Sequence, residues 1–185
     1  MLRPGAASPL ALQMRSPDGA QLREVFSFIS SLYFRGKAAY AAAFGRAPAE
    51  LEPALVISPS EGLVSVDTAL TLERAQRWAG VDIDESNDAF TAPLVRHAEE
   101  LERGYGATTR FVLLGSVASN KYVRPLTRVF GDHLLFPPSF VGRGDMSRGA
   151  VLLRAARDGS ELAYAPVEGA IRHGPRTPRL ATRPT

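Results

Sequence analysis

The spacing of apolar residues changes along the chain, and it predicts helices that alternate with short strands. Helical spacing predicts a buried helix from Ala20 to Phe44, because its apolar face extends nearly all the way round. Further helices are expected to begin at Thr71, near Thr91 and near Ser119 or Asn120. Pro125 would either kink the last of these helices or mark its true first turn. Short, continuously apolar runs predict strands at residues 10–15, 54–58, 110–116 and 133–136.

The segment that follows Gly149 has two interpretations. Residues Ala150 to Arg157 could form a helix that ends at Gly159. A β-hairpin with its turn at Asp158-Gly159 is favoured, because the pairing would put its apolar side chains on one face and its charged ones toward water. The whole pattern therefore predicts a single three-layer α/β domain, with a mainly parallel central sheet, helices on both faces and a C-terminal β-hairpin.

The chain of 185 residues is long enough for one such domain with a core of its own. We expect the domain to span residues 10–168, between a disordered leader at 1–9 and an arginine- and proline-rich tail at 169–185. No apolar run approaches the roughly 20 residues that span a bilayer. The N-terminus also lacks the apolar segment of a secretory signal, so the sequence predicts a cytoplasmic protein without membrane contact.

Charge is distributed unevenly along the chain, although the net charge is only +3. Residues 1–100 have nine basic and thirteen acidic side chains, whereas residues 101–185 have thirteen basic and six acidic ones. A basic half attracts anions and can contact nucleic acid. The chain has no cysteine, which excludes a disulfide, a thiolate metal site and a cysteine nucleophile, and its three histidines form no metal-binding motif. No metal or cofactor is therefore expected.

The stretch Phe140–Gly149 is the strongest candidate for a binding loop. It holds three glycines, two arginines and one aspartate between apolar runs. Glycines let backbone N–H groups approach a ligand, and guanidinium groups add fork-shaped donors, a combination that suits a phosphate or carboxylate. Loops at the carboxyl ends of parallel strands meet at one edge of a sheet, so this loop is expected to meet Ser16–Gly19, Ser58–Gly62 and Gly115–Lys121.

Specific residues at this expected edge are candidates for binding and catalysis. The candidate ligand-binding residues are Ser58, Gly115, Ser116, Lys121, Gly142, Arg143, Gly144 and Arg148. Asp145 is the leading candidate for a general acid or base, with Glu61 and Asp67 as alternatives. Arg35 and Lys37 could reach a ligand, but they are interpreted as side chains that extend to the surface of their helix.

Three short segments together resemble a known group of proteins. They are Leu32-Tyr-Phe-Arg35, Ile57-Ser-Pro-Ser-Glu-Gly-Leu-Val64 with Asp67, and Leu113-Leu-Gly115 with Tyr122. In this order they resemble uncharacterised bacterial α/β domains whose layout is similar to the uracil-DNA-glycosylase-like architecture. The resemblance covers roughly residues 20–145 and implies a nucleobase, nucleotide or nucleic-acid ligand. The signature catalytic motifs of true uracil-DNA glycosylases are absent, so no catalytic residue is transferred.

Two classes of function are consistent with these residues, and a third interpretation is a scaffold whose pocket is vestigial. The first is an enzyme that hydrolyses or transfers part of an anionic nucleotide- or nucleobase-like ligand, with the arginines and glycine-loop N–H groups stabilising negative charge. The second is a module that binds a nucleotide or nucleic acid without catalysis, through the same pocket or through the arginine-rich tail. The chain contains neither a Walker-type phosphate loop nor a Gly-x-Gly-x-x-Gly motif after a strand that would favour one nucleotide class.

Overall fold

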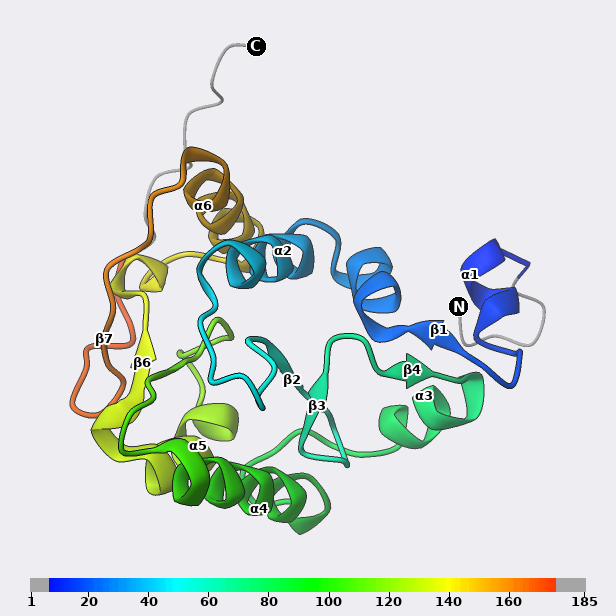
Figure 1. Ribbon diagram of the computed structural model, residues 1–185, viewed down its shortest axis with the longest axis horizontal. Helices are drawn as coiled ribbons and strands as arrows, with labels where there is room; N and C mark the ends of the chain where they lie inside the picture. Colours follow the sequence, from blue (N-terminus) through cyan, green and yellow to red (C-terminus); the bar gives the residue numbers. More distant parts are fainter. Residues whose placement is uncertain (1–6, 176–185) are drawn as a thin grey trace.

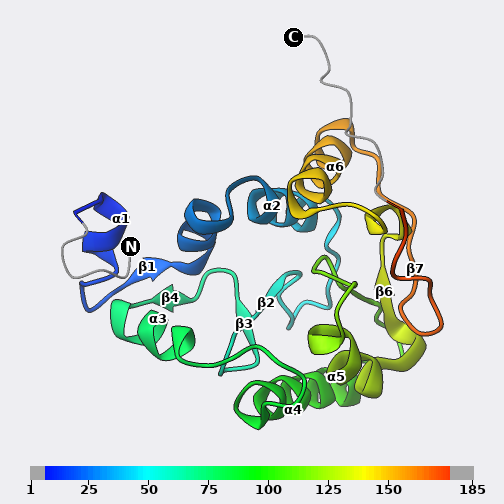
Figure 2. The ribbon, with the colours of Figure 1, turned by 180° about the vertical axis from the view of Figure 1, so that it is seen from behind.

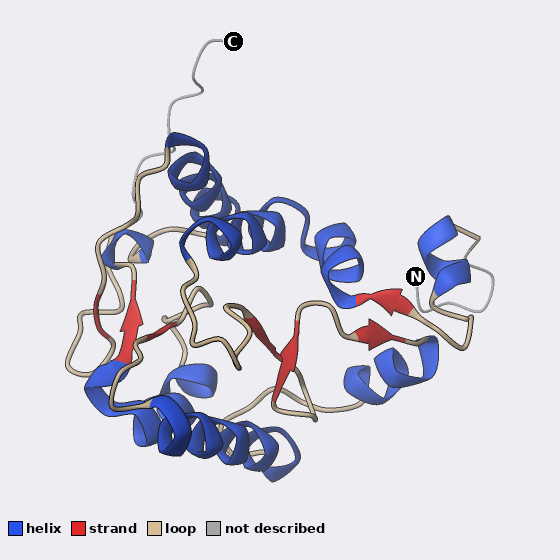
Figure 3. Ribbon diagram, viewed as in Figure 1, coloured by secondary structure: helices blue, strands red, loops and turns tan. Residues whose placement is uncertain are grey.

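The computed structural model describes residues 7–175, and helices account for most of its regular structure (Figures 1 and 3). The α-helices are α1 (Pro9–Gln13), α2 (Leu22–Phe44), α3 (Leu72–Ala79), α4 (Asp88–Tyr105), α5 (Asn120–Phe130) and α6 (Asp145–Asp158). Short 3-10 helices are η1 (Gly131–His133) and η2 (Pro138–Phe140). The strands are β1 (Ala20–Gln21), β2 (Leu55–Ile57), β3 (Leu63–Ser65), β4 (Ala69–Leu70), β5 (Phe111–Val112), β6 (Leu134–Phe136) and β7 (Ala165–Pro166).

The strands form three small sheets, so the predicted three-layer domain with a mainly parallel central sheet is wrong. Strands β1 and β4 pair antiparallel, β2 and β3 form an antiparallel hairpin, and β5–β6–β7 form a three-stranded sheet. Within residues 7–175 the only parallel pair is β5 with β6. Each strand has two or three residues, which is too short for a shared sheet edge along which loops could gather.

Two predicted strands illustrate why the sheet does not form. The apolar run at residues 10–15 is helical instead, because Ser8 caps the amide of Ala11 and Pro9 suits a first helical turn. The run at 54–58 does become a strand, β2, but the chain turns back at Ser58 and pairs with itself through β3. Figures 1 and 2 show this hairpin between α2 and α6 on one side and α4 and α5 on the other.

The predicted C-terminal hairpin is also wrong, since residues 145–158 form the helix α6. Gly159 ends this helix in the left-handed conformation, with φ of 63°, as the alternative interpretation of the segment required. Over so short a segment the apolar pattern fits the period of a helix and that of a strand equally well. The helix forms because it buries Leu152 and Ala155 against α2. Gly149 lies at the contact between α6 and α2.

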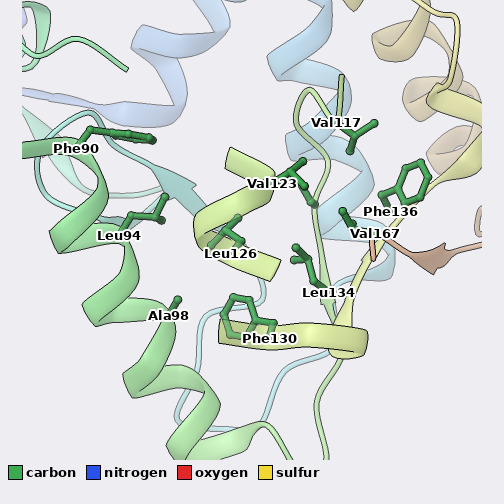
Figure 4. Close-up of a cluster of buried hydrophobic side chains, with 11 residues drawn as sticks. Phe90, Leu94, Ala98, Val117, Val123, Leu126, Phe130, Leu134, Phe136 and Val167 are labelled. Carbon is green, nitrogen blue, oxygen red and sulfur yellow. The ribbon is translucent and has the colours of Figure 1, made fainter. Parts of the chain in front are cut away.

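Buried apolar side chains form three clusters. The largest joins α4 and α5 to the β5–β6–β7 sheet, and Figure 4 shows Phe130 and its neighbours in it. The long helix α2 contributes to both of the others, through Val25 beside Trp78 and through Tyr40 beside Leu152. Because α2 is shared, it holds the α3 part of the molecule and the α6 part together.

The predicted helix over residues 20–44 corresponds closely to α2. The predicted limits of the domain, residues 10–168, stay a prediction. Pro9, placed in the leader by the sequence, begins α1, and residues 1–6 lie outside the described part of the chain. Of the predicted tail, 176–185 also lie outside it. None of the helices within residues 7–175 is both long and apolar enough to cross a membrane. The predicted cytoplasmic location stays a prediction.

Candidate anion-binding site

A close crossing of α2 and α6 brings together the side chains of the candidate site. A Cβ atom added to Gly36 would lie 2.6 Å from the carbonyl oxygen of Gly149, and one added to Gly149 would lie 2.7 Å from the carbonyl oxygen of Leu32. Only glycines therefore allow the two backbones to approach this closely. Tyr33 and Lys37 lie one turn apart beside the crossing on α2, and Arg148 precedes Gly149 on α6.

Arg148 is the buried cation of the site, with only 6% of its surface exposed. Its guanidinium makes long contacts: Nε donates to the carbonyl oxygen of Phe140 at 3.4 Å, and NH1 lies 3.5 Å from a carboxylate oxygen of Asp145. The Asp145 side chain is 68% exposed, so water competes with the guanidinium for this carboxylate. The guanidinium also interacts with the Tyr33 hydroxyl, and its central carbon lies 5.9 Å from the centre of the Phe140 ring. Both partners are uncharged, so Asp145 alone supplies negative charge to the buried cation, and it does so weakly.

Lys37 adds a second cation to the site. Its ammonium lies 4.2 Å from the centre of the Tyr33 ring, over the ring face. Burial lowers the pKa of Lys37, the nearby Asp145 carboxylate opposes this shift, and the positive charge of Arg148 adds to it. Among residues 7–175, no hydrogen bond or ion pair to the Lys37 ammonium is found. The site thus holds two cations near a single, largely exposed carboxylate.

Tyr33 connects these cations to the turn that follows β5. Its hydroxyl donates a hydrogen bond to the carbonyl oxygen of Leu114 at 2.9 Å. Burial raises the pKa of Tyr33 to about 12, against the lowering effect of Arg148, so the phenol stays protonated at neutral pH. Tyr122, on α5, is close enough to raise this pKa slightly, and the Lys121 ammonium lies 5.0 Å from its ring centre.

Tyr33 links two of the loops that the sequence predicted to converge, through helix packing and not at a sheet edge, since it interacts with Leu114 and with Arg148. Gly115 and Ser116 directly follow the carbonyl to which Tyr33 binds, and Asp145 and Arg148 lie on the first turn of α6. Arg143, in contrast, is held by local bonds, from Nε to the carbonyl oxygen of Ser139 at 2.9 Å and from NH1 to the hydroxyl of Ser147 at 3.1 Å.

The loop glycines have a backbone role. Gly142 has φ of 72°, a conformation that side chains disfavour, and it makes the turn between η2 and α6. Gly144 is the N-cap of α6, and no side chain caps this end of the helix. The N–H groups of the first turn of α6, and the positive end of its dipole, are thus next to Arg148. A β-hairpin in this segment would not supply these groups, whereas the helix α6 does.

Three other candidates have structural partners of their own. The Ser58 side chain is buried and its hydroxyl accepts a bond from the amide of Glu61 at 2.8 Å, which stabilises the turn between β2 and β3. Glu61 is paired with Arg74 and accepts a bond from the indole of Trp78 at 2.9 Å, and the Arg74 guanidinium lowers the pKa of Glu61. Asp67 pairs with Arg23 at 2.6 Å. Within the described residues, no hydrogen bond or ion pair joins this group to Lys37 or Arg148.

Sequence reasoning missed Tyr33 altogether and assigned Lys37 to the helix surface. The available signal was Gly36, an unfavourable residue in the middle of a long helix, directly beside Lys37. Such a glycine indicates a close approach of another backbone. Nothing in the sequence identifies Gly149 as the partner, because the two positions are separated by most of the chain.

The fold and the site define a mainly helical protein with small separate sheets and a lysine–arginine site between two crossing helices. No protein-family model, curated protein or solved structure matches the chain. Within residues 7–175, no group of three or more histidine, aspartate or glutamate side chains is arranged to hold a metal ion. The side chains of the site and the first turn of α6 offer cationic and N–H donors.

Proposed function

We propose that this protein binds a small anionic ligand, through a phosphate or carboxylate group, at the α2–α6 crossing. The site consists of Tyr33, Lys37, Asp145, Arg148 and the first turn of α6, and we call it the Lys37–Arg148 site. The single observation behind the proposal is that the cations of Lys37 and Arg148 are both close to one exposed carboxylate, that of Asp145, which interacts with Arg148 only at 3.5 Å.

Physical chemistry supports a functional reason for this arrangement. Placing two positive charges close together away from water is unfavourable, and apolar side chains of similar size would be at least as stable there. Charged side chains that are held in an energetically unfavourable environment are found preferentially at binding and catalytic sites. An incoming anion would compensate the charge that the protein leaves uncompensated. It would approach from the side of Asp145, which is the exposed member of the site.

The ligand class follows from the donors. A guanidinium presents paired N–H groups that match a phosphate or carboxylate, and the ammonium adds a point charge. Backbone N–H groups at the start of α6 bind anions in the same way. The nucleotide or nucleobase identity implied by the sequence resemblance is part of the proposal. If the ligand is also hydrolysed or transferred, Asp145 is the expected acid–base residue beside the two cations.

Thermal-shift measurements test the proposal with defined probes: inorganic phosphate, pyrophosphate, AMP, ADP, ribose 5-phosphate and uncharged uracil. A ligand present at about 100 times its Kd adds roughly 2.7 kcal/mol to the folded state, which for a chain of this size raises Tm by about 5–10 °C. We expect saturable shifts from at least one anion. A shift from uracil alone would contradict an anion site.

Variants locate the binding. Lys37→Met and Arg148→Met each remove one charge from the site and should abolish the shift. Arg157→Met removes the same charge from the exposed last turn of α6 and is the matched control, which should keep the shift. Equal loss in all three variants would indicate general charge attraction. Retention in both site variants would place the ligand elsewhere, and either result would refute the proposed function.

A further inference from the structure

An open groove lies between α5 and the segment that follows β7, and none of the residues that line it belongs to the Lys37–Arg148 site. Its volume is about 630 Å³. Val123 and Val167 line the groove and also belong to the largest apolar cluster (Figure 4). Asn120 and Thr127 add polar groups from α5. The groove therefore combines a rigid apolar base with a polar rim.

The charged side chains around the groove are predominantly arginines. Arg124 and Arg128 lie one turn apart on α5, Arg172 lies opposite, and Glu168 is the one acidic side chain among the lining residues. Arg128 has no hydrogen bond or ion pair within residues 7–175. Arg124 pairs with Glu85 at 3.3 Å, but its side chain is 73% exposed, so this ion pair is weak. Both α5 arginines are thus available to an anion from solution.

Arg172 is held in place by the protein. Its guanidinium donates to the carbonyl oxygen of Val117 at 3.3 Å and to the side-chain oxygen of Asn120 at 3.0 Å. These bonds use two of the five donors of a guanidinium and fix its plane at the groove, next to the N-terminal end of α5. A positioned arginine gives up little conformational entropy when a phosphate binds.

The sequence that follows β7 is also rich in arginine. From Gly169 to the C-terminus the chain has Arg172, Arg176, Arg179 and Arg183, and no acidic residue. An extended run of cations complements an extended polyanion better than it complements a single small ligand.

We infer that this groove binds the phosphodiester backbone of a nucleic acid, without reading its base sequence. Arginine side chains on one helix and on the facing segment can each neutralise a phosphate, and phosphate contacts give affinity and orientation in protein–nucleic-acid binding. None of the residues lining the groove is aromatic, so the base stacking typical of single-strand binders is missing. A duplex, with its regular rows of phosphates, is therefore the expected form.

Fluorescence anisotropy with the full chain tests this inference, using short labelled duplexes of two unrelated sequences across a salt series. Arg124→Ala/Arg128→Ala removes two proposed phosphate contacts. The matched control, Arg96→Ala/Arg103→Ala, removes two exposed charges from α4. Each lost contact lowers the magnitude of the salt slope of the binding constant by about 0.9 for a duplex, so the groove variant should lose about 1.8. Its affinity at about 0.1 M salt should fall on the order of tenfold or more, while the control changes much less.

A third variant, with Arg176, Arg179 and Arg183 changed to alanine in the full chain, separates the groove from the terminal arginines. Circular dichroism confirms that each variant is folded. Weaker binding by the groove variant than by the α4 control, equal for both duplex sequences, supports the inference. Equal losses in the two variants, loss only in the terminal variant, or binding of pyrophosphate without any duplex binding would each overturn it. Lys37→Met should leave duplex affinity unchanged, which keeps this test independent of the Lys37–Arg148 site.

Discussion

Lys37→Met is the most informative single change in the Lys37–Arg148 site, because it alters charge while changing little else. Methionine has an unbranched side chain of similar length and a helix propensity close to that of lysine, so α2 should be preserved. The substitution removes an ammonium that is half-buried, lies over the Tyr33 ring and is near Arg148. It leaves the apolar contacts of the stem in place.

Opposing effects decide the sign of the stability change. The variant loses the interaction of the ammonium with the Tyr33 ring, at 4.2 Å, which is worth roughly 0.5–1 kcal/mol at a partly exposed position. It also loses attraction to Asp145. It gains relief from the burial of a charge and from repulsion by Arg148, the two effects that lower the pKa of Lys37. Burial is the largest cause of the lowered pKa of Lys37, and we expect it to outweigh the ring interaction. The expected result is a net stabilisation on the order of 1 kcal/mol and a Tm higher by about 2–4 °C.

The difference between variant and wild type should depend on pH in a defined direction. Because the pKa of Lys37 is lowered on folding, the wild type bears the full cost while lysine is protonated in both the folded and unfolded states. As pH rises through the folded pKa toward the ordinary value of 10.5, the folded state releases its proton first and the cost disappears. The advantage of Lys37→Met should therefore be largest near pH 7 and shrink as the pH approaches 10.5.

Urea unfolding of wild type, Lys37→Met and the control Arg157→Met, at pH 7 and at about pH 9.5, measures this difference. These values lie below the ionisation of free tyrosine near pH 10, so the phenols contribute little. The expected result is a more stable variant that no longer binds the anionic probes. A variant less stable than wild type by about 1 kcal/mol or more would show that Lys37 is a stabilising packing group. The case for a charge-strained binding site would then fail.

Three further predictions concern packing and titration. Gly149→Ala should destabilise the protein by about 1–3 kcal/mol, because its Cβ would lie 2.7 Å from a backbone oxygen of α2. Gly104→Ala, in α4 with open space around it, should stabilise the protein by up to about 1 kcal/mol. Thermal unfolding measures both variants, and a higher Tm for Gly149→Ala as well as for Gly104→Ala would refute the close crossing. Tyr33→Phe loses a buried hydrogen bond and should cost about 1–2 kcal/mol at pH 7. Because burial raises the pKa of Tyr33 to about 12, against about 10 unfolded, this stabilisation is fully present below pH 10 and is lost as pH rises through 12. Urea curves at pH 9 and pH 11 should therefore show the gap to Tyr33→Phe narrowing. Glu61→Gln should make the free energy of unfolding less dependent on pH in acid. The lowered pKa of Glu61 adds stability above about pH 4.5 that is lost as pH falls through the folded value, and an unchanged dependence on acid pH would contradict this.

The long helices were predictable from sequence, and the sheet was not. In α2 the apolar residues repeat over many turns, which leaves one interpretation. Runs of three or four apolar residues fit a strand, a short helix or a loop equally well, and here tertiary contacts decided among them. The run at residues 10–15 became α1 through the Ser8 cap, and residues 150–158 joined α6 through contacts with α2. The predicted parallel sheet depended on every such short run being a strand.

The candidate site was predicted in part, and for an incorrect reason. The glycine–arginine composition of Phe140–Gly149 indicated the same region that supplies Asp145 and Arg148 to the proposed site, because that inference rested on local chemistry. The expected meeting with Ser58 and Glu61 rested on strand order, and those residues instead stabilise the β2–β3 turn and the Arg74 pair. Interactions across the chain, such as the electrostatic effect of Arg148 on Lys37, depend on tertiary packing that periodicity alone does not determine.

The glycine pair explains why packing and charge cannot be separated at this site. Gly36 and Gly149 set the distance between α2 and α6, and Lys37 and Arg148 are their immediate neighbours. A larger residue at either glycine would move the helices apart and so reduce the repulsion between the cations, at the expense of the contacts buried in the crossing. The close packing thus stabilises the helix pair and at the same time creates the uncompensated positive charge. An anion bound there would offset that charge without any change in the packing, which is why ligand binding should add to stability in the wild type and not in Lys37→Met.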